Sequence, residues 1–164
     1  MEIVEFINEE SQSNDLKEFL TSQTWEFYEE EQITEESFNT KMSKNHFRND
    51  STKTYLCYEN GCLLGCMRYF DLENVDDDFP MFDIKIHESS RGKGVGTFLL
   101  NQTLGLIFKE YSNIFRIEAT TREDNVAMQK LFEKCGFNIW GKSSKSWKKN
   151  SGEFVSTFHY EKFR

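Results

Sequence analysis

The sequence predicts a mixed α/β fold in a single domain that spans residues 1–164. Three observations carry this prediction. Two strand-like runs flank Asn60-Gly61, the preferred pair for a two-residue hairpin turn. A strand pattern, a glycine-rich loop and a helix pattern follow one another over 81–111, and a strand, a helix and another strand follow over 114–141. Such alternation indicates parallel strands joined by a crossover helix, and the hairpin adds antiparallel strands, so we expect a mixed sheet.

The first half of the chain is predicted to contain a strand, then two helices, and then the hairpin. Residues 2–7, EIVEFI, alternate apolar and acidic side chains, which predicts a strand. Apolar residues at helical spacing predict a helix from Asn14 to roughly Thr21, and Thr34 with the acidic turn after it predicts the start of a second helix. The hairpin covers 54–70, and the polar, acidic stretch 71–78 is predicted as a loop.

The second half begins with a strand over 81–87, MFDIKIH, and a loop from Arg91 to Gly96. A helix follows, because apolar residues recur on one helical face; they are Leu100, Leu104, Ile107, Phe108 and Tyr111. Residues 114–121, IFRIEATT, form the next predicted strand.

A last helix and two strands complete the prediction. Either Asp124 or Asn125 caps this helix, and Gly136 lies where a glycine commonly ends one. The apolar face of the helix consists of Met128, Leu131, Phe132 and Cys135. The tail contains two more strand-like runs, at 137–141 and 153–163.

Composition and charge exclude several function classes. The net charge of −8 disfavours nucleic-acid and anionic-membrane partners, which require a basic surface. The apolar runs are too short for a membrane span, and the acidic start lacks the basic region of a signal peptide. None of the four cysteines forms a C-x-x-C pair, so we expect no metal site and interpret them as small buried side chains in a reducing cytoplasm.

The glycine-rich stretch RGKGVG, residues 91–96, is typical of an anion site at a helix start. Free backbone N–H groups and the helix dipole attract an anion there, and Arg91 and Lys93 add charge. The spacing does not fit a P-loop, and Gly92, Gly94 and Gly96 lack the G-x-G-x-x-G spacing of a dinucleotide fingerprint. Two interpretations of the loop stay open at this point: it only turns the chain, or it is an anion site with the R-x-x-G-x-G pattern.

The R-x-x-G-x-G pattern resembles the pyrophosphate-binding loop of the GCN5-related N-acetyltransferase (GNAT) superfamily. The downstream stretch NVAMQKLFEKCGF, residues 125–137, resembles a second signature of the same superfamily, one helix and one strand later. The tail after residue 140 resembles the branch that contains ribosomal-protein N-terminal acetyltransferases. The resemblance covers about residues 54–163.

The resemblance implies a GNAT fold, a mixed and mostly antiparallel sheet of about seven strands with a splayed parallel pair and about four flanking helices. It implies acetyl-coenzyme A as cofactor and an amine as the acceptor in a ternary complex. The splayed strands would be 81–87 and 114–120. Coenzyme A would be bound by Ile86, His87, Glu88, Arg91, Gly92, Lys93, Gly94, Val95, Gly96, Thr97, Asn125, Met128 and Phe132.

Two carboxylates interrupt apolar strands and are candidates for catalysis. Asp83 and Glu118 would bind or deprotonate the amine, because an unpaired charge in a buried strand is costly. The structural alternative is that each pairs with a neighbour such as Lys85 or Arg116. The resemblance implies that a backbone N–H near Ile86 stabilises the oxyanion. His87 is a weaker candidate for the base.

The acceptor pocket is expected between the first two helices and the acidic 71–79 loop. Trp25 and Tyr28 lie beside acidic residues in TWEFYEEEQ, residues 24–32, and aromatic faces with carboxylates suit a cationic amine. The loop contributes Asp76, Asp77 and Asp78. The alternative interpretation is a solvated acidic rim above core aromatic residues.

The sequence departs from the superfamily at two positions. Phe132 occupies the place of a frequent acid tyrosine, and Met128 that of a serine common in the ribosomal-protein branch. Water, Tyr160 or Cys135 would then protonate the thiolate. The departures also leave open a coenzyme A-binding regulatory or inactive module, besides a different nucleotide-binding enzyme. A monomer and a homodimer are both compatible with the sequence.

Overall fold

A seven-stranded mixed sheet forms the centre of the structure, a computed structural model that describes residues 1–73 and 79–164. The order of its strands is β1-β2-β3-β4-β5-β7-β6. The strands are β1 (Glu2–Glu5), β2 (Lys53–Glu59), β3 (Cys62–Phe70), β4 (Met81–Ile86), β5 (Arg116–Arg122), β6 (Asn138–Lys148) and β7 (Phe154–Phe163). The helices are α1 (Glu10–Thr21), α2 (Glu35–Ser43), α3 (Val95–Glu110) and α4 (Val126–Lys134), with the short 3-10 turn η1 (Glu88–Ser90) before α3. The predicted fold class is therefore confirmed.

The hairpin between β2 and β3 forms as the turn residues predict. Asn60 and Gly61 both have positive φ angles, 52° and 76°. These angles are those of a type I′ turn, whose twist matches that of the flanking strands. Glu59 pairs with Cys62 directly across the turn. The turn thus sets the register of the first half of the sheet.

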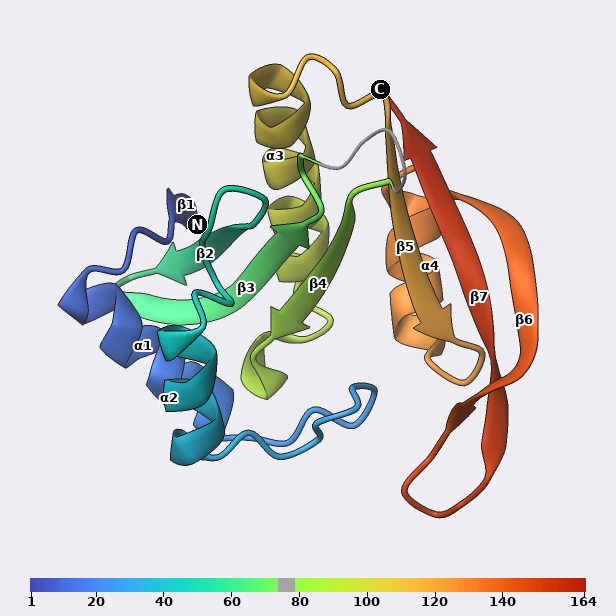
Figure 1. Ribbon diagram of the computed structural model, residues 1–164, viewed down its shortest axis with the longest axis horizontal. Helices are drawn as coiled ribbons and strands as arrows, with labels where there is room; N and C mark the ends of the chain where they lie inside the picture. The colour runs from blue at the N-terminus through green and yellow to red at the C-terminus, as the bar shows by residue number, and fades with distance from the viewer. Residues whose placement is uncertain (74–78) are drawn as a thin grey trace.

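The parallel pair β4–β5 is splayed. Among the described residues Met81 and Glu118 form the only ladder pair, next to a hydrogen bond of 2.9 Å from the Glu118 N–H to the Pro80 carbonyl. Beyond this point the strands diverge toward their C-terminal ends (Figure 1). The sheet therefore consists of two halves, β1–β4 and β5–β7–β6, with a gap between them.

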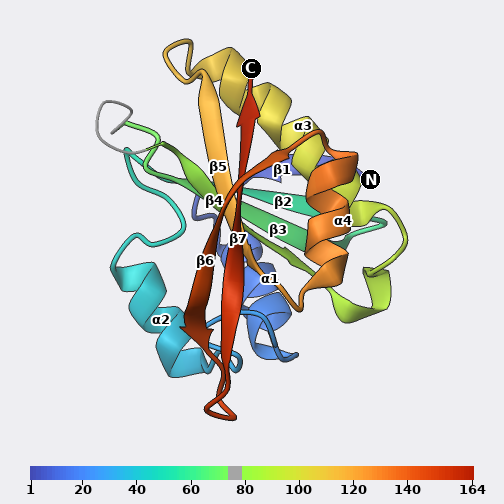
Figure 2. The same ribbon diagram turned by 90° about the vertical axis from the view of Figure 1, so that its right-hand side faces the viewer.

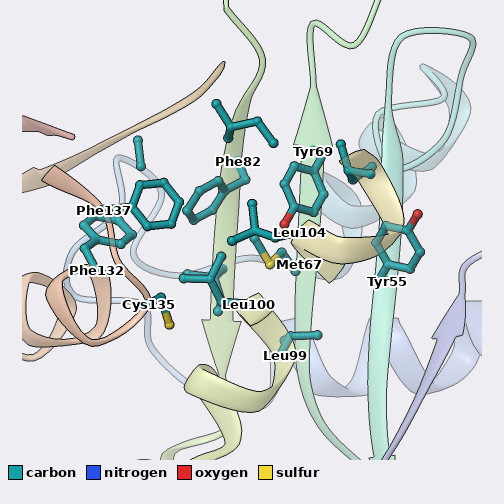
Figure 3. Close-up of a cluster of buried hydrophobic side chains, with 14 of the residues drawn as sticks. Tyr55, Met67, Tyr69, Phe82, Leu99, Leu100, Leu104, Phe132, Cys135 and Phe137 are labelled. Carbon is teal, nitrogen blue, oxygen red and sulfur yellow. The ribbon is translucent and has the colours of Figure 1, made fainter. Parts of the chain in front are cut away.

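The helices cover the sheet on both faces (Figure 2). On one face α3 and α4 pack on the main core, where the aromatic rings of Tyr69, Phe82, Phe132 and Phe137 meet α3 side chains such as Leu100 (Figure 3). On the other face α1 and α2 cover a second cluster. It consists of Phe6, Leu16, Phe19, Leu20, Trp25, Ile33, Phe38, Phe47, Leu56 and Cys66. Burial on both faces explains why the central strands are rich in apolar residues.

Several predicted boundaries are wrong; β1 ends at Glu5 rather than at residue 7, and β5 begins at Arg116 rather than at residue 114. Helix α1 begins at Glu10 rather than Asn14, because Gln12 turns toward the sheet and bonds both the Ile7 N–H and the Glu5 carbonyl. Helix α3 begins at Val95, inside the predicted loop. Strand β6 continues to Lys148 instead of ending at residue 141, because pairing with β7 outweighs the weak strand propensity of its lysines and serines.

Within residues 1–73 and 79–164, no helix is both long and apolar enough to cross a bilayer. The acidic residues Asp76, Asp77 and Asp78, predicted to border the acceptor pocket, lie outside the described residues.

Candidate active site

The glycine-rich loop forms an open cradle at the start of α3. Gly92 and Gly94 have φ angles of 74° and 85°, and Gly94 is the residue that caps the helix. Only glycine adopts such angles without strain. In the described part of the chain, no backbone amide from Gly92 to Thr97 donates a hydrogen bond of normal geometry to another protein group. The cradle thus has the free donors and the dipole that an anion requires.

The cationic side chains of the loop differ in position. Lys93 and Arg91 are both exposed, but the Arg91 side chain folds back and its Nε donates to the Ile86 carbonyl at 3.2 Å. Val95 is buried beneath the loop. A Cβ at Gly96 would lie 3.3 Å from Leu131 of α4, so this glycine permits close packing of α3 on α4. The predicted loop residues are therefore brought together in one turn.

The residues directly before the loop, His87 and Glu88, are held by hydrogen bonds at the η1 turn. The ring Nδ1 of His87 accepts from the Ser89 N–H at 3.3 Å, so His87 caps the η1 turn. The Glu88 N–H binds the side chain of Gln23 at 2.8 Å, which ties the end of α1 to this turn.

Two carbonyls of β4 point into the gap between the splayed strands. The Ile86 carbonyl accepts from Arg91, and the Ile84 carbonyl accepts from the hydroxyl of Tyr28. Because β5 has moved away, side chains instead of strand partners satisfy these acceptors. The carbonyls of Ile86 and Ile84 thus face the gap and have side-chain donors instead of strand partners.

A cleft with a volume of about 130 Å³ occupies the gap. Its walls come from the loop after α1, both splayed strands, α4 and the β6–β7 arm. The residues that line it are Phe27, Tyr28, Phe82, Asp83, Ile84, Thr120, Thr121, Arg122, Asn125, Met128, Phe132, Trp147 and Thr157. Figure 1 shows the loop after α1, in blue, reaching across the open end of the gap. The cleft thus unites the predicted residues Tyr28, Asp83, Asn125, Met128 and Phe132.

The two predicted carboxylates have different surroundings. Asp83 lines the cleft and is more than one third exposed, and its Oδ2 accepts from Arg68 at 2.6 and 3.2 Å. Glu118 does not line the cleft, and it pairs with Arg116, which also binds Glu161 at 2.9 Å. The structural alternative, in which each carboxylate pairs with a neighbouring cation, therefore holds for Glu118 with Arg116. Asp83 is also paired, but its partner is Arg68 rather than Lys85.

A lysine beneath the cleft contacts aromatic rings. The Lys85 Nζ lies 3.3 Å from the ring centroid of Tyr28 and 5.6 Å from that of Trp25. Burial lowers the pKa of Lys85, and the negative charge of nearby Asp83 offsets part of this shift. Burial, and then the charge of Asp83, raises the pKa of Tyr28 well above its ordinary value. Tyr28 therefore keeps its proton and acts as a donor.

Trp25 lies outside the cleft. Its side chain is buried in the second core cluster, and its Nε1 donates to the Leu20 carbonyl at 2.9 Å. The apolar contacts of α1 draw the ring inward, so it supports Tyr28 from behind.

Asn125 and the adjacent α4 residues form the opposite wall. The Asn125 side-chain oxygen accepts from the Met128 N–H at 3.2 Å, which confirms Asn125 as the helix cap. Phe132 is buried against Phe82, Phe137 and Tyr160. The wall formed by Met128 and Phe132 is therefore apolar and carries no hydroxyl.

Arg122 is an important residue of the cleft that the sequence reasoning missed. Its side chain is only 5% exposed and binds Asp124 through two hydrogen bonds of 3.0 and 2.7 Å. A third hydrogen bond, of 3.1 Å, reaches the Glu26 carbonyl, and the guanidinium lies over the ring of Phe27. Arg122 thus anchors the loop that carries Tyr28. The sequence signal that could have identified Arg122 is its place directly after the predicted strand 114–121.

A second, outer pocket adjoins the cleft. It has a volume of about 270 Å³ and shares Tyr28 and Trp147 with the cleft. Its other lining residues are Glu29, Glu31, Ser146, Lys148, Lys149 and Asn150. Two acidic residues, two lysines and aromatic rings therefore line the pocket outside the cleft.

Comparisons with known proteins agree with this geometry. The family model described as acetyltransferase (GNAT) family matches residues 15–137. The chain superposes on an acetyltransferase of the GNAT family from Streptococcus pneumoniae with a TM-score of 0.79 and 21% identity, over 99% of this chain and 100% of that one. No curated protein matches the sequence.

Two further solved structures carry more specific descriptions. Spermidine N-acetyltransferase from Vibrio cholerae, in complex with CoA and spermine, has a TM-score of 0.82 and 16% identity over 98% of this chain and 95% of that one. Ribosomal-protein-alanine N-acetyltransferase from Brucella melitensis has a TM-score of 0.80 and 16% identity over the full length of both chains. At such identities these likenesses concern the fold alone.

Proposed function

Because the chain belongs to the acetyltransferase (GNAT) family, we propose that it transfers an acetyl group from acetyl-coenzyme A to a primary amine within a ternary complex. The acceptor is a small cationic molecule or a peptide amine. One observation carries the proposal: an open anion cradle at the start of α3 leads along β4 into a cleft that contains Asp83.

The residues of the cradle and the gap fit coenzyme A. The free amides of Gly92–Thr97 and the charge of Lys93 suit a pyrophosphate. The carbonyls of Ile84 and Ile86 face the gap and suit the amides of a pantetheine arm. The full set that would hold the cofactor is Ile86, His87, Glu88, Arg91, Gly92, Lys93, Gly94, Val95, Gly96, Thr97, Asn125, Met128 and Phe132. When bound, the cofactor supplies an acetyl group activated as a thioester.

The protein must also prepare the acceptor. An alkylamine with a pKa of about 10 is mostly protonated at neutral pH and has no lone pair to attack with. Asp83 lines the cleft, and we propose that it binds the ammonium and directs its proton to solvent. Glu118 is paired with Arg116 and is better placed to support the strand. The backbone N–H of Ile86 is the proposed donor to the oxyanion.

Carboxylates beside aromatic side chains support a cationic acceptor. Glu29 and Glu31 border the outer pocket together with Lys148 and Lys149, and Asp83, Tyr28 and Trp147 line the cleft behind it. Carboxylates with aromatic faces attract alkylammonium groups. The relatives described above include enzymes for spermidine and for a ribosomal protein, so both kinds of acceptor belong in the test.

An acetylation assay with a panel of amines tests this function. Release of free thiol from acetyl-coenzyme A is followed with polyamines, amino acids, aminoglycosides and peptides with free N-termini. Asp83→Asn is expected to lower kcat/KM by about 10²-fold, in the range of a lost proton acceptor. Glu118→Gln is the matched carboxylate control outside the cleft. An equal effect of the two changes would contradict the assignment of Asp83.

A second candidate is a coenzyme A-binding regulatory module. The apolar wall of Met128 and Phe132, without a hydroxyl, favours it. Calorimetric binding of acetyl-coenzyme A without thiol release across the whole panel would support this alternative, and steady turnover with any amine would exclude it.

A further inference from the structure

We propose that the Tyr28 hydroxyl is the hydrogen-bond donor to the sulfur that leaves during acetyl transfer. This inference rests on the proposed function. It assigns a catalytic role to a residue of the loop after α1, on the wall of the cleft opposite α4. The donor would then come from a different element than the helix that carries Phe132.

The geometry brings the thioester to Tyr28. The anion cradle lies beyond the C-terminal end of β4, and the strands meet at Met81 and Glu118 at the other end of the gap. A chain that is anchored in the cradle and extends along β4 must end inside the closed part of the gap. Ile84 lies in this inner part, and its carbonyl holds the Tyr28 hydroxyl. The hydroxyl therefore marks the place where the acyl end arrives.

Other described side chains of the cleft also carry N–H donors, among them the amide of Asn125 and the indole of Trp147, but of the lining residues only Tyr28 bonds a carbonyl of β4 inside the gap. Asp83 is an acceptor when ionised, and Arg122 uses three of its five N–H donors on Asp124 and Glu26, which hold its guanidinium in place. Phe132 and Met128 have no polar hydrogen. The remaining hydroxyls belong to threonines of β5 and β7. A phenol hydroxyl is a stronger donor than an aliphatic one, and Tyr28 already points into the gap.

Two contacts hold the Tyr28 ring in place. Lys85 lies 3.3 Å from the ring centroid on one side, and Trp25 packs against the ring edge at a centroid distance of 6.4 Å. Arg122 fixes the loop two residues earlier through the Glu26 carbonyl. Only the hydroxyl hydrogen needs to turn, from the Ile84 carbonyl to the sulfur. Such a donor is organised before the reaction and costs little reorganisation during it.

The step balances without another reactant. The amine nitrogen forms the C–N bond and loses its proton to water. The C–S bond breaks, and its electron pair stays on the sulfur. The Tyr28 hydroxyl donates a hydrogen bond to this thiolate but keeps its proton, and the thiolate takes a proton from water after it leaves the site.

Kinetics with Tyr28→Phe provide the first test. This change keeps the ring over Lys85 and removes only the hydroxyl. We expect kcat to fall by about 10²-fold, as for the loss of one preorganised donor, with little change in the KM of the amine. Tyr58→Phe is the matched control, because the Tyr58 hydroxyl also donates to an acceptor, the Asp15 carboxylate, but Tyr58 does not line the cleft. An unchanged kcat in Tyr28→Phe would overturn the proposal.

Calorimetry provides a readout that does not depend on turnover. Wild-type protein should bind coenzyme A more tightly than desulfo-coenzyme A, which lacks the sulfur, and the preference should grow as the pH rises toward the thiol pKa. Tyr28→Phe should bind the two compounds equally. Equal binding by the wild type overturns the proposal even if the variant does not fold. If the wild type shows the preference but acetylates no amine, the proposed function fails and the Tyr28–sulfur contact stands.

Discussion

Replacement of Arg122 by Met should destabilise the protein by about 2–3 kcal/mol. The side chain is 5% exposed and makes three hydrogen bonds, two to the Asp124 carboxylate and one to the Glu26 carbonyl. Hydrogen bonds to charged groups contribute about 1.5–3 kcal/mol each, but they are not additive. Asp124 is one third exposed and keeps Lys149 at 2.9 Å, so water and lysine offset part of the loss.

Urea unfolding followed by tryptophan fluorescence measures this change. For a chain of 164 residues the expected loss corresponds to a fall in Tm of roughly 4–12 °C. Arg48→Met is the matched control, because Arg48 also binds a carboxylate and a carbonyl, those of Glu5 and Phe6, but is 39% exposed. It should cost less than about 1 kcal/mol. Equal costs for the two variants would refute the reasoning from burial.

Arg122→Met should also change how strongly the stability of the protein falls at acid pH. Hydrogen bonds from Arg122, and then from Lys149, lower the pKa of Asp124 from 3.8 to about 2. A carboxyl with a lowered pKa stabilises the fold above its unfolded pKa, and this contribution is lost as the pH falls toward 2. Arg122→Met should therefore lose less stability than the wild type between pH 4 and pH 2. A parallel decline of both proteins would contradict this origin of the pKa.

Three further predictions concern stability. Thr34→Ala removes the hydroxyl that accepts from the Ser37 N–H at the start of α2, and should cost about 1 kcal/mol in urea unfolding, whereas Thr34→Ser should not. Gly94→Ala places a side chain at a φ angle of 85° and should cost about 1–2 kcal/mol, although no atom lies within 4 Å to clash; a smaller loss would mean that the loop relaxes. Burial, and then the charge of Arg68, lowers the pKa of His46 from 6.5 to about 4. Because the unfolded chain binds a proton at a higher pH than the folded protein does, the free energy of unfolding should fall as the pH drops from 6.5 to 4. His46→Gln should flatten this part of the pH profile, and an unchanged profile would exclude His46 as its source.

Local signals in the sequence predicted much of the fold. The Asn60-Gly61 turn and the helix start at Thr34 form as predicted, and Asn125 is the one of the two candidate caps that caps α4; these features involve groups only two to three residues apart. Gly136 ends α4 with a φ angle of 76°. The extent of β6 was not predictable in this way, because its polar residues become a strand only through pairing with β7.

The sequence by itself determined the order of the elements, the family motifs and the loop that ends in the anion cradle, because neighbouring residues form these features. Only the tertiary structure decided which side chains meet in the cleft. Tyr28 binds Ile84 across 56 residues, and Arg122 binds Glu26 across 96. The splay between β4 and β5 leaves the carbonyls of Ile84 and Ile86 to side-chain donors, and the pairing of β3 with β4 places Asp83 opposite Arg68. Such contacts depend on strand order and on the position of a long loop, which no local pattern encodes.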